Sequence, residues 1–164
     1  MRDAFGGVTS LVIIVVFLVL VSGYLAFNVS YTKAFRVKNR IISLYEQYEG
    51  KQCFDEINSE CNKKIVEYMN QVGYNPGTNP ITITAQDAED GGLAADSYKC
   101  YHGYCAIKFD VKKVDNSSYD DMKVRAYYKI ITQIEIDIPI LNKIIPYLRV
   151  FTIAGDTKPI VIGR

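Results

Sequence analysis

The first thirty residues carry an unbroken apolar run. No charged side chain occurs between Asp3 and Lys33, and residues 11–21 are all aliphatic or Phe. Because an α-helix rises about 1.5 Å per residue, roughly twenty such residues cross a hydrocarbon core about 30 Å thick. In lipid the backbone must satisfy its own hydrogen bonds, and a helix does so within one segment. The pattern predicts a transmembrane helix over residues 8–28. The alternative, a buried core helix, is rarely this long without a polar face.

The helical pattern continues beyond the apolar run. One apolar stripe contains Val37, Ile41, Leu44 and Tyr48. We therefore expect the helix to continue as a solvated spine over residues 29–50 and to end at Gly50. The alternative is a separate amphipathic helix that lies on the lipid headgroups.

A second, shorter helix is predicted over residues 56–72. Asp55 can cap its start, and Gly73 followed by Pro76 can end it. Its apolar side contains Ile57, Cys61, Ile65, Tyr68 and Val72. After a connection rich in Gly, Pro and Asn, residues 81–84 alternate as a short strand.

Residues 86–96 form an acidic segment that contains glycine. Asp87, Glu89 and Asp90 precede Gly91, so calcium binding is an alternative to a simple solvated loop. The spacing and the closing Glu of an EF-hand loop are missing, however. We therefore expect a solvated loop.

From residue 97 the apolar positions alternate, which predicts an antiparallel sheet of about four to six strands. Residues 100–105 are typical of a hairpin tip. The next strand has Ile107, Phe109 and Val111 on one face. The clearest strand covers residues 124–138, with apolar even positions. Such a face must lie on another element, and we expect it to cover the two helices.

The C-terminal part of the chain contains three further elements. Pro139 ends the long strand, since it has no N–H to donate. Residues 141–148 predict a turn of helix, and residues 149–153 and 159–162 predict a final hairpin. The chain as a whole is expected to have an α+β fold. It divides into a short leader (1–7), the transmembrane helix (8–28), its extension (29–50) and an extracytoplasmic domain (51–164).

All four cysteines follow the apolar run: Cys53, Cys61, Cys100 and Cys105. In a small anchored domain they favour two disulfides in an oxidising compartment. Three pairings are possible, and the sequence-local one has the smallest loop-closure cost. A zinc site is the alternative, but the spacings match the usual close ligand pairs poorly.

The cysteines and the basic residues disagree about orientation. Lys33, Arg36, Lys38 and Arg40 follow the apolar run, and the positive-inside rule places that side in the cytoplasm. Disulfides require the same side to be outside. We give the cysteines more weight and expect a single-pass membrane protein whose C-terminal domain lies outside the cytoplasm. The basic residues would then contact lipid phosphates or acidic groups of neighbouring subunits at the membrane exit.

The sequence offers no recognisable active site. The only histidine is His102, at the expected hairpin tip, and no C-x-x-C, nucleophile-elbow, phosphate-loop or H-E-x-x-H motif occurs. We therefore expect no enzyme activity, no cofactor, no metal and no small-molecule substrate. Residues 41–164 carry three more acidic than basic side chains, which gives no basic patch for nucleic acid.

Two stretches resemble a known family. Gly6-Gly7 followed by VTSLVIIVVFLVLVSGYLAFNV resembles the start of a type IV prepilin or TadE-like segment. Residues 134–162, IEIDIPILNKIIPYLRVFTIAGDTKPIVI, are similar to the closing strands of TadE-like pseudopilins of Gram-positive tight-adherence secretion systems. The resemblance covers about a third of the chain. It implies a structural or assembly component of a surface pilus or secretion apparatus. Its partners would be membrane lipid, other pilin-like subunits or a pilus assembly platform.

The resemblance also implies how the N-terminus is processed. Cleavage between Gly7 and Val8 would place Val12 at the fifth mature position, where the family has an acidic residue. This departure implies an accessory role rather than a major subunit. Apart from this resemblance, the run is better explained as an uncleaved signal anchor than as a cleaved secretory signal peptide, because it is longer than a secretory h-region and no A-x-A site follows it.

Two surfaces for protein contacts are expected. The small residues Ser10, Ser22 and Gly23 would let a neighbouring helix approach closely. The alternative function is an anchored extracellular binding module that does not polymerise. Its concave site would lie among Tyr98, Tyr101, His102 and Tyr104.

Overall fold

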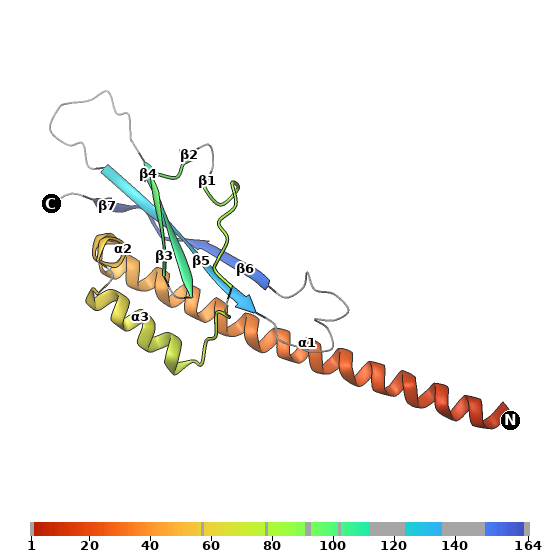
Figure 1. Cartoon of the computed structure of the whole chain (residues 1–164). Helices are drawn as coiled ribbons and strands as arrows, with labels where there is room; N and C mark the ends of the chain where they lie inside the picture. The colour runs from red at the N-terminus through yellow and green to blue at the C-terminus, as the bar shows by residue number, and fades with distance from the viewer. Residues whose placement is uncertain are drawn as a thin grey trace.

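The computed structural model describes residues 2–56, 58–77, 79–90, 93–101, 103–111, 124–135 and 150–162. The helices are α1 (Arg2–Gln47), α2 (Lys51–Asp55) and α3 (Glu60–Gln71). The strands are β1 (Glu89–Asp90), β2 (Leu93–Ala94), β3 (Ser97–Tyr101), β4 (Tyr104–Val111), β5 (Val124–Glu135), β6 (Val150–Asp156) and β7 (Ile160–Ile162). The sheet packs against the C-terminal half of α1, while the N-terminal half projects beyond every other element (Figure 1). The predicted α+β fold is confirmed.

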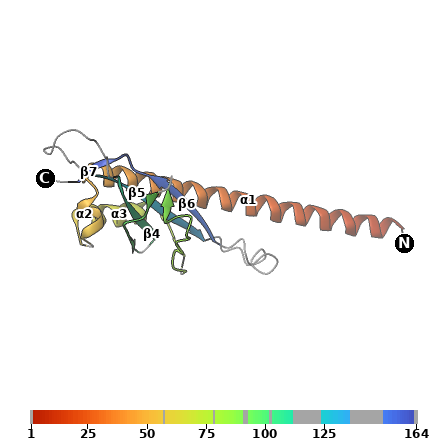
Figure 2. The same ribbon diagram turned by 90° about the horizontal axis from the view of Figure 1, so that it is seen from above.

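The helix α1 is continuous over 46 residues, so the predicted spine is confirmed and no separate surface helix forms. Its buried positions recur every three or four residues. They are Ala34, Val37, Lys38, Ile41, Leu44 and Tyr45. This stripe packs on β5 and joins α3 in one apolar core. A view turned by 90° shows α1 lying along the sheet, with α2 and α3 at the end far from the N-terminus (Figure 2).

The second helix begins later than predicted. Asp55 is the last residue of α2, and it is Ser59 that caps α3, its Oγ accepting the Asn62 N–H at 3.2 Å. Cys53 and Cys61 form a disulfide with a Cα–Cα distance of 5.3 Å. Eight residues of continuous helix would separate these atoms by about 12 Å, so the chain must turn between them. Ile57 lies outside the described residues, and Gly73, with φ of 60°, ends α3 as expected.

The main sheet is antiparallel, in the order β3-β4-β5-β6, with β7 also paired to β5. As predicted, even positions of β5 such as Tyr128 and Ile130 enter the core with the helices. Ile107 and Phe109 of β4 lie on the opposite face, in a second apolar cluster with Ile131. That cluster is covered by Ile81, Ile83 and Ala95, and residues 81–84 do not form the predicted strand.

The predicted final hairpin is wrong. β6 and β7 do not pair with each other. Both pair with the long strand β5, Asp156 opposite Lys129 and Ile160 opposite Ala126. The register shifts by one residue between these pairs, so residues 157–159 form a bulge in one interrupted edge strand. Pro159 occupies the break, where no ladder N–H is needed. The elements predicted at residues 136–149 lie outside the described ranges.

The turn at Gly50 gives a direct test of the packing between α1 and the sheet. Gly50 has φ of 69°, and a Cβ at this position would overlap the Tyr128 ring. Gly50→Ala is expected to lower the free energy of unfolding by about 2 kcal/mol, from backbone strain and from displacement of a buried ring.

Gly73→Ala is the matched control. It has φ of 60°, but the nearest atom to its Cβ is the Lys33 Nζ, at 3.7 Å. Only the strain, about 1 kcal/mol, should remain there. Equal costs in urea unfolding would contradict the close approach to Tyr128.

Candidate functional site

The N-terminal half of α1 is an apolar surface that nothing else in the described part of the chain covers. Leu11 and Phe17 are each 63% exposed, and Leu25 is 59% exposed. Among the described residues, α1 is the one helix long and apolar enough to cross a membrane. Each square ångström of apolar surface in water costs about 25 cal/mol, so an uncovered surface of this size needs an apolar environment. The arrangement fits a single-pass membrane protein (Figure 1).

The small residues in this half of α1 do not line one face. Successive residues on a continuous helix are rotated by about 100°, so Ser22 and Gly23 point in different directions and Ser10 in a third. Ser22 Oγ also donates to the Leu18 carbonyl at 2.7 Å, within α1 itself. The three residues therefore do not form the single contact face expected for them. At the proposed leader junction, Gly7 and Val8 are both within α1, and Val8 is 66% exposed.

The four basic residues after the apolar run do not gather into one patch. Lys33 Nζ donates to the Gly73 carbonyl at 3.3 Å, where a cation complements the C-terminal end of α3. Arg40 lies over the Tyr68 ring at 5.9 Å. Arg36 is exposed and, within the described residues, has no hydrogen bond or ion pair. Lys33 and Arg40 thus both contact the α3 region, which the sequence did not predict for them.

Lys38 is used differently from the other three. Only 8% of it is exposed, and its Nζ donates to the Ala154 carbonyl of β6 at 3.5 Å. Its Nζ also lies 4.5 Å from the centre of the Phe35 ring. A Cβ at Gly155 would meet Lys38 at about 3 Å, so the glycine makes room for the lysine stem. Lys38 therefore fixes the edge strand β6 to α1.

The two disulfides follow the sequence-local pairing, Cys53 with Cys61 and Cys100 with Cys105. Cys100 and Cys105 are opposite each other in the β3–β4 hairpin, as predicted. Cys53 and Cys61 join the end of α2 to the start of α3 and are fully buried. Two disulfides fit a domain in an oxidising compartment.

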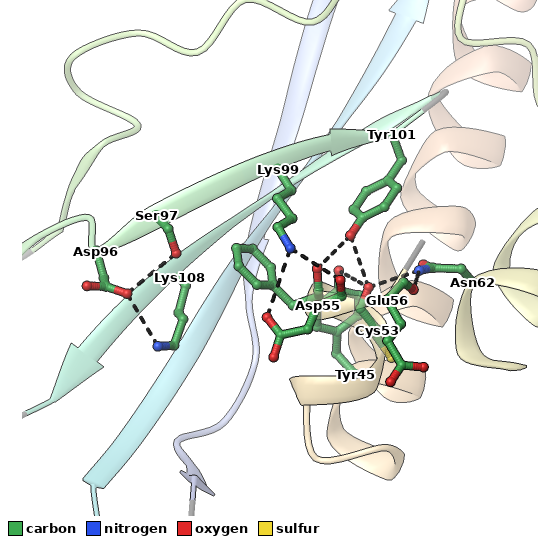
Figure 3. A network of polar contacts seen from close by, with 11 residues as sticks. Tyr45, Cys53, Asp55, Glu56, Asn62, Asp96, Ser97, Lys99, Tyr101 and Lys108 are labelled. Carbon is green, nitrogen blue, oxygen red and sulfur yellow. Dashed lines mark hydrogen bonds and ion pairs between the residues drawn. The ribbon is translucent and has the colours of Figure 1, made fainter. Parts of the chain in front are cut away.

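A polar network converges on the Cys53 carbonyl, beside the first disulfide (Figure 3). Asn62 Nδ2 donates to the carbonyls of Cys53 and Glu56 at 3.0 and 2.7 Å. Its Oδ1 accepts the Tyr104 hydroxyl at 2.8 Å. From β3, the Tyr101 hydroxyl lies 3.2 Å and 2.9 Å from the carbonyls of Cys53 and Phe54. The network ties α2, α3 and the hairpin together, and burial raises the pKa of the Tyr104 hydroxyl.

These contacts separate the tyrosines that were expected to share a binding site at the hairpin tip. Tyr101 and Tyr104 stack on each other, with ring centres 4.9 Å apart, and use their hydroxyls inside the domain. Tyr98 is opposite Ile107 in the register, so it lies on the other face of the sheet. His102 is outside the described residues. The described tyrosines therefore do not share a concave surface.

The acidic segment is used for structure. Asp87 accepts the Thr84 N–H at 2.9 Å and its hydroxyl at 2.6 Å, which closes a turn. Asp90 accepts the Tyr127 hydroxyl at 2.9 Å, and burial together with the Asp90 charge raises the pKa of Tyr127. No group of three or more His, Cys, Asp or Glu side chains within the described ranges could hold a metal ion.

A groove lies where α1, the loop after α3 and the end of β5 meet. Its lining residues are Ser30, Lys33, Gly73, Tyr74, Asn75, Ile134 and Glu135. The lining is mainly polar and contains one cation and one carboxylate. The charge pattern of the sequence gave no signal for this groove, because residues from α1, the loop after α3 and β5 meet only in the folded chain.

Comparisons of the chain with protein-family models, with curated proteins and with solved structures found no match.

Proposed function

We propose that the protein is a membrane-anchored, pilin-like structural or assembly component of a surface pilus or secretion apparatus, similar to TadE-like subunits. One observation carries the proposal. A single helix presents an uncovered apolar half and then continues, without a break, as the packing surface of a disulfide-linked sheet. Such a subunit can be stored in lipid and can later pack its apolar half against sister helices.

The contacts between helix and sheet support this role. Val37, Ile41 and Tyr45 are fully buried under the sheet, and Lys38 bonds to β6. A domain held on α1 in this way turns with the helix as one body. Packing of neighbouring α1 helices would therefore also set the relative positions of the displayed sheets. In this proposal the sheet domain lies outside the cytoplasm, at the cell envelope.

Cysteine cross-linking in intact cells tests the assembly. Single variants Ile13→Cys, Ile14→Cys, Val15→Cys and Val16→Cys cover one full turn of the exposed half of α1. If α1 packs against sister helices, oxidation should give cross-linked species at one or two of these positions and monomer at the others. The off-face positions serve as internal controls. Pilin-like subunits should copurify with the uncross-linked protein.

Two outcomes would contradict the proposal. Monomer at all four positions, without pilin-like partners, would favour the non-polymerising anchored module. Protection of the sheet domain from protease added to intact cells would place it in the cytoplasm and exclude a surface role. N-terminal sequencing of the membrane-extracted protein tests the leader separately, and a start at Val8 is the result expected for a processed pilin-like chain.

A further inference from the structure

Aromatic rings link the end of the apolar half of α1 to the edge of the sheet. The Phe27 ring centre is 5.6 Å from that of Phe151, the second residue of β6, and 6.0 Å from that of Tyr31. Tyr31 stacks on Phe35, with ring centres 6.4 Å apart. Tyr31 and Phe35 remain 44% and 42% exposed. We call Phe27, Tyr31, Phe35 and Phe151 the aromatic collar.

The position of the collar along α1 follows from the helix rise. From Val8 to Phe27 the helix covers about 29 Å, which is close to the thickness of a hydrocarbon core. If this stretch spans the membrane, Phe27 lies at the boundary between hydrocarbon and headgroups. Tyr31 then lies about 6 Å further out, at the headgroup level where tyrosines are enriched. Because Phe151 touches Phe27, the start of β6 lies at the same depth.

Charged groups limit how deeply this end of the domain can enter the bilayer. Lys33 lies about 9 Å beyond Phe27 along α1. Glu135 is opposite Val150 in the register of β5 and β6, so its carboxylate belongs to the same end of the sheet as Phe151, on the other face. A charge in the hydrocarbon interior costs several kcal/mol, whereas the headgroup layer accommodates charges. These positions allow contact with the headgroups and exclude deeper burial of the sheet.

We propose that the sheet domain rests directly on the bilayer surface through the aromatic collar, with the start of β6 at the interface and no stalk between membrane and sheet. The partner is the lipid interface, and the inference rests on the membrane insertion that the proposed function requires. Its support is the continuity of the collar with the apolar half of α1. It predicts one fixed orientation of the sheet relative to the membrane.

Tryptophan fluorescence tests this orientation, because the protein contains no Trp and each variant reports on one position. Four variants of the full chain are reconstituted in phosphatidylcholine vesicles that carry bromine either high or low on the acyl chains. Phe151→Trp and Tyr31→Trp probe the collar, and Val16→Trp probes the middle of the apolar run. Tyr98→Trp is the control, since Tyr98 is 63% exposed and opposite Ile107 in the part of the sheet far from Phe151.

The expected result is stronger quenching by the shallow bromine for both collar variants, and by the deep bromine for Val16→Trp. Tyr98→Trp should not be quenched. Quenching of Val16→Trp without quenching of Phe151→Trp would overturn the inference while membrane insertion stands, whether the domain is held away or a second copy covers the collar. Quenching of Tyr98→Trp would also overturn the inference, because the domain would then lie on its side. No quenching of Val16→Trp would overturn the inference and the proposed anchor together. If Phe151→Trp does not fold, Tyr31→Trp carries the test, and absence of quenching by the shallow bromine at Tyr31→Trp would overturn the inference.

Discussion

Replacing Asn62 by Ala is expected to lower the free energy of unfolding by about 3 kcal/mol, because three hydrogen bonds are lost at once and the buried Tyr104 hydroxyl is left without its acceptor. The Asn62 side chain is only 6% exposed and makes three hydrogen bonds. The Cys53 carbonyl keeps the Tyr101 hydroxyl and the Glu56 carbonyl keeps the Ser59 N–H, so the largest loss falls on the buried Tyr104 hydroxyl. Urea unfolding of the full chain in detergent, followed by near-ultraviolet circular dichroism, measures it.

Two further variants separate the hydrogen bonds from the helix itself. Asn70→Ala removes an exposed Asn from the same helix and should change the stability by less than about 0.5 kcal/mol. Asn62→Asp keeps the shape and the acceptor for Tyr104 but loses both donors, and it should be destabilising at neutral pH. At low pH its protonated carboxyl can donate again, so part of the loss should be recovered. Equal effects of Asn62→Ala and Asn70→Ala would contradict the network.

The pattern of apolar positions predicted the elements whose buried face is long and regular. A helix with one apolar stripe and a strand with apolar even positions leave few alternatives, so α1, the helix-facing side of β5 and the hairpin around Cys100 and Cys105 were predicted correctly. The same pattern contains a further signal, at Lys38. Lys38 lies four residues after Ala34 and three before Ile41, inside the buried stripe. A basic residue at such a position indicates a specific partner, here the Ala154 carbonyl.

Pairing and local breaks could not be predicted from alternation. The strands β6 and β7 have patterns that fit any neighbour, and only the length of β5 makes room for both on one edge. The break between α2 and α3 depends on the disulfide, which helix periodicity does not encode. For the candidate site, too, the sequence pattern did not encode contacts between distant segments. The sequence located the apolar run and the basic residues, but the contact of Phe27 with Phe151 joins positions more than a hundred residues apart.

Raising the pH above 10 is expected to unfold the domain. Burial raises the pKa of Tyr45, Tyr104 and Tyr128, and raises that of Tyr74 to about 12. Their ordinary pKa in an unfolded chain is about 10, so above that pH the unfolded state releases protons that the folded state retains. The corresponding stability is fully present below pH 10 and is lost as the pH rises toward each folded pKa. For Tyr74 alone, the difference between a pKa of about 10 and one of about 12 amounts to about 3 kcal/mol.

Absorbance at 295 nm and circular dichroism, recorded on the same samples, measure this effect. Protein unfolded in guanidinium is the control and should titrate near pH 10. In the folded protein, ionisation of the buried tyrosines should coincide with loss of the near-ultraviolet signal. Ionisation of all tyrosines at pH 11 with the fold retained would contradict the burial of these hydroxyls.

Tyr74→Phe distinguishes the linkage from the hydrogen bonds. The Tyr74 hydroxyl lies 2.6 Å from the Gln133 carbonyl and accepts the Gln133 N–H at 3.1 Å. Its removal should lower the stability at every pH, by about 1–2 kcal/mol. It should also make the loss between pH 10 and pH 12 smaller, because one group that retains its proton in the folded state is gone. The constant offset in the free energy of unfolding reports the contact between the loop after α3 and β5. The change in the slope of that free energy against pH reports the burial of the hydroxyl. A variant with an offset but an unchanged slope would show that Tyr74 ionises as freely in the folded chain as in the unfolded one.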